Sequence, residues 1–185
     1  YGNHAEERAM SQSGSHSVRG EPDYLRTLRG VIGPDLLLAP AAAALIWNGR
    51  GEALVTENGA SRRTGIPEGA IRPDESPRAA LVRVAKEETG LEVTPLTIAG
   101  IVGGAAGFRP FDASGGKVEY TLIIFHCRIV SASAGIGMGG FQWLSPRELC
   151  ELHPGYPPEL FRASGGAAVF QWDESWLETL LAQEE

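Results

Sequence analysis

Apolar runs bounded by Pro, Gly and Asn residues predict a series of short β-strands along the chain. The segments with this pattern are 36–38, 41–47, 52–56, 91–102, 118–130 and 141–144, the last of these being the final strand expected. Pro40 is expected to divide the first two, because proline cannot donate a hydrogen bond to a neighbouring strand. Asn48-Gly49-Arg50-Gly51 predicts a hairpin turn, and the Gly-rich residues 103–116 predict a long loop.

Helix signals occur before, between and after these strands. The clearest helix spans residues 77–89, where Ser76 can act as the N-cap, Pro77 fits the first helical position and Gly90 provides a left-handed stop. A second start is the capping box Ser145-Pro146-Arg147-Glu148. The further helical segments expected are 24–29, a turn at 159–163 and a terminal helix from about residue 173.

The helix over 77–89 carries a cluster of charged side chains. Arg83 and Glu87 are four residues apart, so they lie on one face and can pair. Position 84 lies three and four residues before Glu87 and Glu88, so these three positions share a face. Glutamates at this spacing suit Mg²⁺ or Mn²⁺, which prefer oxygen ligands. The alternative is a solvated helix face held by salt bridges.

The spacing of this cluster resembles the Nudix box. The pattern of that family is Gly, five residues, Glu, seven residues, then Arg-Glu-aliphatic-any-Glu-Glu-any-Gly-aliphatic. The residues that match in register over 69–91 are Gly69, Glu75, Arg83, Glu87, Glu88 and Gly90. The hairpin before the box and the Pro-containing helix start at 145–148 also match the family layout, which extends the resemblance over most of 24–183.

The resemblance implies an α/β fold, a Nudix-like α/β/α sandwich with a mixed central sheet. It also implies a hydrolase that cleaves a nucleoside diphosphate linked to another moiety, using Mg²⁺ or Mn²⁺ and an attacking water. Glu87, Glu88 and Arg83 are then the expected catalytic residues. Glu87, Glu88 and the carbonyl of Gly69 would contact metal, Arg83 would orient the carboxylates, and Glu75 would support it.

Three features depart from the family pattern. Val84 stands where the family has a Glu that binds metal or, in some members, acts as the general base, and valine can do neither. Residues 131–140 contain no acid, although many members have a further catalytic or metal-binding acid there. Glu68 adds a carboxylate to the loop facing the helix. The hypothesis is that Glu68 partly replaces the missing metal ligand, and the alternative is that it points to solvent.

The candidate substrate contacts lie in residues 103–116. Phe111 (or Phe108) can stack on a nucleotide base and Arg109 can bind a phosphate, but one Phe can equally pack inward with Arg109 solvated. His126 alternates within a predicted strand and is expected to be a hydrogen-bonded core histidine rather than a base. These residues do not distinguish one nucleotide derivative from another.

Composition favours one globular domain at 21–185 after a disordered or tag-like tail at 1–20. The 185 residues are 43% hydrophobic and 21% charged, as is usual for globular proteins. The net charge of −7 argues against a nucleic-acid polymer as partner, and no apolar run reaches the length of a membrane span. Two cysteines without metal-ligand spacing and a start unlike a signal peptide favour the cytoplasm. The amphipathic segment 24–38 allows a homodimer.

Two function classes stay open. The preferred one is a metal-dependent hydrolase of the diphosphate linkage in a nucleoside diphosphate derivative, because a scaffold without chemistry needs no clustered carboxylates. The other is a catalytically impaired Nudix-fold protein that binds a nucleotide or a protein partner. Val84 and the acid-free residues 131–140 favour the second class.

Overall fold

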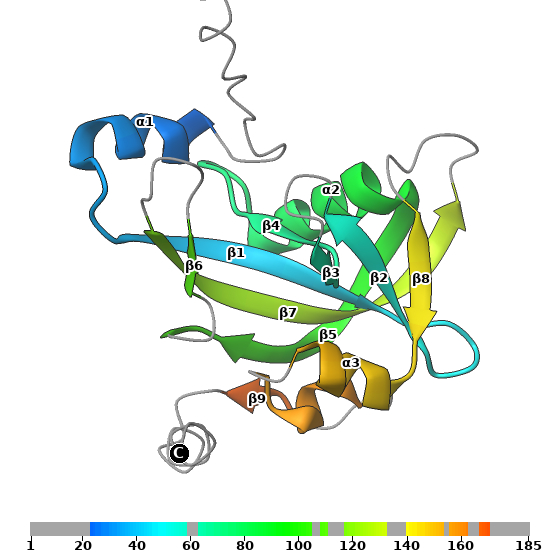
Figure 1. Ribbon diagram of the computed structural model, residues 1–185. Helices are drawn as coiled ribbons and strands as arrows, with labels where there is room; N and C mark the ends of the chain where they lie inside the picture. The colour runs from blue at the N-terminus through cyan, green and yellow to red at the C-terminus, as the bar shows by residue number, and fades with distance from the viewer. Residues whose placement is uncertain are drawn as a thin grey trace, which may run out of the picture.

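The computed structural model describes residues 23–58, 63–104, 108–110, 117–132, 140–153, 156–162 and 167–170 (Figure 1). Its helices are α1 (Asp23–Ile32), α2 (Pro77–Thr89) and α3 (Pro146–Leu152), followed by the 3₁₀ helix η2 (Pro158–Phe161). Its strands are β1 (Leu37–Ile46), β2 (Ala53–Asn58), β3 (Arg63–Gly65), β4 (Glu68–Ala70), β5 (Leu91–Val102), β6 (Phe108–Pro110), β7 (Lys117–Ala132), β8 (Phe141–Leu144) and β9 (Val169–Phe170).

The strands form two sheets. The larger has the order β4-β1-β7-β5-β9 with β6 paired to β7, and it is mixed: β1 runs parallel to β7, whereas β4 and β5 are antiparallel to their neighbours β1 and β7. The smaller sheet has the order β3-β2-β8. Helix α2 packs on one face of the larger sheet, and α3 with η2 packs on the other (Figure 1). The predicted α/β/α sandwich with a mixed sheet is confirmed.

Strand β1 shows why the sheet is covered on both faces. Successive side chains of a strand point to opposite faces. Ala42, Ala44 and Ile46 pack with residues of α2, whereas Ala43 and Leu45 pack with residues of α3 and η2. The run of small and apolar residues is therefore typical of a central strand buried from both sides.

The prediction that Pro40 divides this strand is wrong, because β1 runs unbroken from Leu37 to Ile46. The Pro40 carbonyl accepts a hydrogen bond from the Ile71 N–H on the β4 side of the strand. The nitrogen and carbonyl of one strand residue point to the same side, so the missing N–H also faces that side, just beyond the end of β4. The parallel pairing of β1 with β7 therefore loses no hydrogen bond at Pro40.

Two short strands also differ from the sequence-based expectation. Phe108–Pro110, expected to lie in a loop, forms β6 and pairs with β7. The strand at Phe141–Leu144 is confirmed but is not the last, since Val169–Phe170 forms β9 beside Gly100 and Ile101 of β5. Strands of two or three residues are too short for a periodic pattern, and backbone pairing with a long neighbour defines them.

The predicted hairpin turn carries the chain from one sheet to the other. The Asn48 side-chain oxygen accepts hydrogen bonds from the N–H groups of Arg50 and Glu52, and the Asn48 N–H donates to the Glu52 carbonyl. Beyond a single bridge between Trp47 and Ala53, β1 and β2 pass into different sheets. The turn thereby places β2 where it can face α2.

The first helix is confirmed and slightly longer than predicted. Leu25 of α1 is buried with Leu37 and Val118, so the helix closes one end of the larger sheet. In the part of the chain that the structure describes, no helix is long and apolar enough to cross a membrane. The proposed tail at 1–20 and the terminal helix from about residue 173 lie outside the described residues.

Candidate functional site

Helix α2 begins and ends as its sequence predicts. The Ser76 hydroxyl accepts a hydrogen bond from the Ala79 N–H at 3.2 Å, and Pro77 occupies the first turn. Gly90 has φ 71°, and its N–H donates to the Lys86 carbonyl at 3.0 Å. These caps satisfy backbone groups at both helix ends and so fix which side chains of the box face the sheet.

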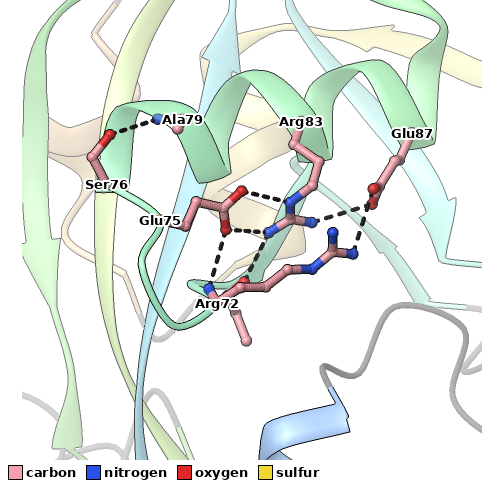
Figure 2. A network of polar contacts seen from close by, with 7 residues as sticks. Arg72, Glu75, Ser76, Ala79, Arg83 and Glu87 are labelled. Carbon is pink, nitrogen blue, oxygen red and sulfur yellow. Dashed lines mark hydrogen bonds and ion pairs between the residues drawn. The ribbon is translucent and has the colours of Figure 1, made fainter.

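Arg83 binds the residues before the helix (Figure 2). Its Nε and Nη2 donate to the two oxygens of Glu75 at 2.7 and 2.8 Å, and Nη2 also donates to the Ala70 carbonyl at 3.1 Å. The guanidinium holds the pKa of the Glu75 carboxyl below its usual range. The bidentate pair with Glu75 ties α2 to the loop before it, and the bond to Ala70 ties α2 to the end of β4.

Glu87 lies on the outer side of this network. One of its oxygens is 3.2 Å from Arg83 Nη1 and the other is 3.5 Å from Arg72 Nη2 (Figure 2). The Glu87 side chain is 48% exposed. The pair with Arg83 is the one predicted from the four-residue spacing, whereas Arg72 is fifteen residues away in sequence and no periodicity indicates it. A cation that binds Glu87 must compete with two guanidinium groups.

Glu88 faces the opposite way, toward β2 and β4. Its Oε2 accepts a hydrogen bond from the Thr56 hydroxyl at 2.9 Å, and its carboxylate also accepts from the Glu68 backbone N–H. Burial, with smaller contributions from the negative charges of Glu68 and Glu87, raises the pKa of the Glu88 carboxyl to about 7. Thr56 is 4% exposed and was not among the residues that the sequence indicated.

The shared face expected for positions 84, 87 and 88 resolves into two rows. Residues four apart on a helix differ by about 40° around its axis, whereas neighbours differ by about 100°. Arg83 and Glu87 therefore form one row, and Val84 and Glu88 form the next. The first row is partly exposed and holds the arginine network, while the second turns inward.

Val84 is 3% exposed and packs on β4. A Cβ atom built on Gly69 would lie 2.7 Å from Val84 Cγ2, closer than side chains tolerate. Gly69 has extended backbone in β4, so this position needs glycine for the close approach of the helix rather than for an unusual turn. The valine thus fills the space between the helix and the strand and supplies no oxygen.

Strand β4 presents two candidate ligands in different directions. Hydrogen bonds join Ala44 with Pro67 and Ile71 with Pro40, so the alternation of an antiparallel ladder makes Ala42 and Gly69 a hydrogen-bonded pair. The Gly69 carbonyl therefore points toward β1. Glu68, one residue earlier, points its backbone toward Glu88, and its side chain is partly buried. Because successive side chains of a strand alternate between faces, the Glu68 side chain leaves β4 on the face opposite to the one on which Gly69 meets Val84, and it is half-buried rather than fully exposed to solvent.

The donor set suits a divalent cation in chemistry but only partly in arrangement. The electrostatic effect of Glu68 on Glu88 indicates negative charge that a hard cation would offset. Among the described residues, however, no group of three or more His, Cys, Asp or Glu side chains is arranged to hold a metal. Glu87 is paired with arginines and Val84 is apolar, which leaves Glu68 and Glu88 as the carboxylates closest to a shared site.

The other residues singled out in the sequence lie elsewhere. Arg109 is in β6 opposite Val118 of β7, while Phe111 falls outside the described residues. His126 Nδ1 accepts a hydrogen bond from Trp47 Nε1 at 3.0 Å, and burial lowers the His126 pKa. The histidine is therefore hydrogen-bonded, as expected, but it is half-buried rather than in the core, and it is not part of the carboxylate cluster.

Comparison with known proteins identifies the family. The model of the NUDIX domain matches residues 37–162, which include the smaller sheet, the larger sheet apart from β9, and helices α2 and α3. The chain belongs to the NUDIX domain family. The Nudix resemblance predicted from the box is therefore confirmed. Among curated proteins, no significant match was found.

Solved structures with the same fold include several Nudix proteins. A MutT protein from Methanosarcina mazei Go1 is 27% identical, with 68% of this chain and 91% of that chain covered at a TM-score of 0.50. An ADP-ribose pyrophosphatase from Streptococcus suis 89-1591 is 16% identical, covering 71% and 98% at 0.52. A UDP-X diphosphatase is 12% identical, covering 79% and 73% at 0.53. The last two establish the fold alone. The family match and the first neighbour support the predicted enzyme class, a Nudix pyrophosphohydrolase.

Proposed function

We propose that the protein hydrolyses the diphosphate linkage of a nucleoside diphosphate derivative with the help of Mg²⁺ or Mn²⁺. One observation carries the proposal: within a NUDIX domain, a partly buried carboxylate, Glu88, is held by two hydrogen-bond donors beside the second acid Glu68. A buried carboxylate with like charges nearby is costly unless a cation accompanies it. The neighbours described as ADP-ribose pyrophosphatase and UDP-X diphosphatase suggest the substrate class.

Each residue of the site has a distinct part in this proposal. Glu88 and Glu68 would hold the metal, with Glu87 joining when it leaves its arginine partners. The Gly69 carbonyl, which points toward β1, would join only by turning away from that strand. A bound divalent cation would neutralise diphosphate oxygens and lower the pKa of a bound water. Arg83 keeps α2 in place against Glu75. Arg109 and Phe111 remain the candidate contacts for phosphate and base.

A screen of phosphate release tests the proposal. Nucleoside diphosphate derivatives, including ADP-ribose and UDP-sugars, are incubated with the protein in Mg²⁺, in Mn²⁺ and in EDTA, with phosphatase added to release phosphate from the products. Turnover that requires metal and is lost in Glu88→Gln supports the proposal. Turnover that persists in EDTA, or that is unchanged in Glu88→Gln, contradicts it.

The second candidate function is nucleotide binding without hydrolysis. It is favoured by Val84, which is buried where the family pattern has an acid. Calorimetric titration with the same compounds distinguishes the two functions. Measurable nucleotide binding with no turnover in either metal would favour the binding protein.

The proposal of a homodimer rests on apolar side chains near the N-terminal helix. Val31 of α1 and Leu38 of β1 are 80% and 71% exposed. Sedimentation of the protein and of a Val31→Glu, Leu38→Glu double variant tests it. Both chains sedimenting as monomers would rule out a dimer through this surface.

A further inference from the structure

The Glu88 carboxylate, on α2, contacts a residue that lies outside the box, in the smaller sheet. Thr56 lies in β2, between Gly65 of β3 and Phe141 of β8 in register. Its hydroxyl donates to Glu88 Oε2 at 2.9 Å across 32 residues of sequence. We propose that Thr56 is a positioning residue that holds the Glu88 carboxylate in the orientation in which it binds metal. This inference rests on the metal-dependent function proposed above.

The surroundings of Thr56 make it suited to this task. It is 4% exposed and lies in the middle of the smaller sheet, so its backbone is held on both sides. A β-branched side chain has few rotamers, which keeps the hydroxyl in one place. A carboxylate can only accept hydrogen bonds, so the Thr56 proton is necessarily directed at Glu88 in the ionised state.

Two donors from different elements fix the carboxylate. The Glu68 backbone N–H contacts it from β4, and the Thr56 hydroxyl contacts it from β2. A glutamate side chain has several rotatable bonds, and a site that must order it on binding loses affinity. In this chain the orientation of Glu88 matters more, because Val84 stands where the family pattern has another glutamate that would also bind the metal ion. The hydroxyl is the donor that a substitution can remove.

The alternative is that Thr56 merely fills space under β8. Thr89 provides a control at equal burial, since it is also 4% exposed and its hydroxyl donates to the Ala85 carbonyl at 2.6 Å and accepts from the Leu91 N–H at 3.1 Å. Thr89→Val therefore makes the same chemical change at equal burial without touching the Glu88 carboxylate. A loss specific to Thr56 then reports on the carboxylate contact rather than on general stability.

The experiment measures Mn²⁺ binding to the full chain by the electron paramagnetic resonance signal of free Mn²⁺, together with thermal unfolding in EDTA. Removing an outer partner of a metal ligand costs roughly 10–100-fold in metal affinity. We expect Thr56→Val to lose about tenfold or more in Mn²⁺ affinity, Thr56→Ser to retain affinity within about threefold, and Thr89→Val to bind like wild type. If Thr56→Val does not fold, Thr56→Ala serves as the hydroxyl-free variant.

The outcomes separate this inference from the proposed function. Wild-type Mn²⁺ affinity in Thr56→Val, or an equal loss in Thr56→Ser, would overturn the positioning role while leaving the metal-dependent function standing. A wild-type protein that binds no Mn²⁺ would refute metal dependence and this inference together. Absence of hydrolysis with intact Mn²⁺ binding would refute the hydrolase alone.

Discussion

Replacing Val84 with glutamate introduces the carboxylate of the family pattern into a space that the valine now fills. Burying a valine side chain contributes about 1.5–3 kcal/mol, and Val84 is 3% exposed. A buried polar group without a partner costs about 1–3 kcal/mol more. The new charge would also lie one turn from Glu88, whose pKa is already raised by burial and, to a smaller extent, by neighbouring acids. We expect Val84→Glu to lose about 2.5–6 kcal/mol of folding free energy in EDTA.

Metal should reverse part of this loss. A third carboxylate increases the affinity of the site for a hard cation, and a ligand present at 100 times its dissociation constant stabilises the folded state by about 2.7 kcal/mol. The assay is thermal unfolding in EDTA and in Mn²⁺. One kcal/mol corresponds to about 2–4 °C for a chain of this size, so a decrease of about 5–24 °C is expected in EDTA. If a missing ligand limits the native protein, Val84→Glu will also gain hydrolysis rate.

The control is Val84→Gln, which has nearly the same shape as the glutamate variant but no charge. We expect Val84→Gln to be destabilised in EDTA and to gain no more from Mn²⁺ than wild type does. Two results would refute the reasoning. One is a Val84→Glu protein as stable in EDTA as wild type. The other is a Mn²⁺ effect equal in the two variants, because the added carboxylate would then not reach the ion.

Three further predictions follow from the same contacts. Gly69→Ala should lower the free energy of unfolding in urea by about 1–3 kcal/mol, because the added methyl group clashes with Val84. The double variant Gly69→Ala, Val84→Ala should lose less than the sum of the two single variants, and strict additivity would contradict the contact. In EDTA the wild-type protein should lose stability as pH rises from 4.5 to about 7, because the unfolded chain releases the Glu88 proton at a lower pH than the folded chain does. Glu88→Gln lacks this proton and should therefore become more stable than wild type by up to about 3 kcal/mol over that range, whereas a difference independent of pH would contradict the raised pKa. Arg72→Ala should strengthen Mn²⁺ binding by about 1.5–5-fold by freeing a carboxylate, while Arg78→Ala, a charge-matched change on the first turn of α2, should not; equal effects would indicate net charge alone.

The parts of this protein that were predictable from sequence are those determined by nearby residues. Ser76 and Gly90 bound α2 because capping depends on groups within four residues. The pair of Arg83 with Glu87 follows from the helical repeat. Pro40 was misjudged because its effect depends on which neighbour its nitrogen faces, and that is a property of the assembled sheet.

The contacts that define the site depend on residues distant in sequence. Thr56 and Arg72 approach Glu88 and Glu87 from other elements, and neither has a local pattern that indicates the contact. The family pattern gives the spacing of the helix positions but not their division into two rows. That division depends on how α2 is rotated against the sheet, which the packing of Val84 on Gly69 helps to set.

The arginine network and the Glu88 carboxylate, both within the box, depend on different parts of the fold. The arginine network joins residues within one continuous stretch, from Ala70 to Glu87, and needs only the end of β4, the loop after it and α2. The hydrogen bond that holds the Glu88 carboxylate comes from Thr56 of β2, which belongs to the smaller sheet. A chain in which the smaller sheet had come away would keep the network and lose the Thr56 contact to Glu88. The state of that carboxylate therefore reports whether the two sheets are docked, which the helix alone does not.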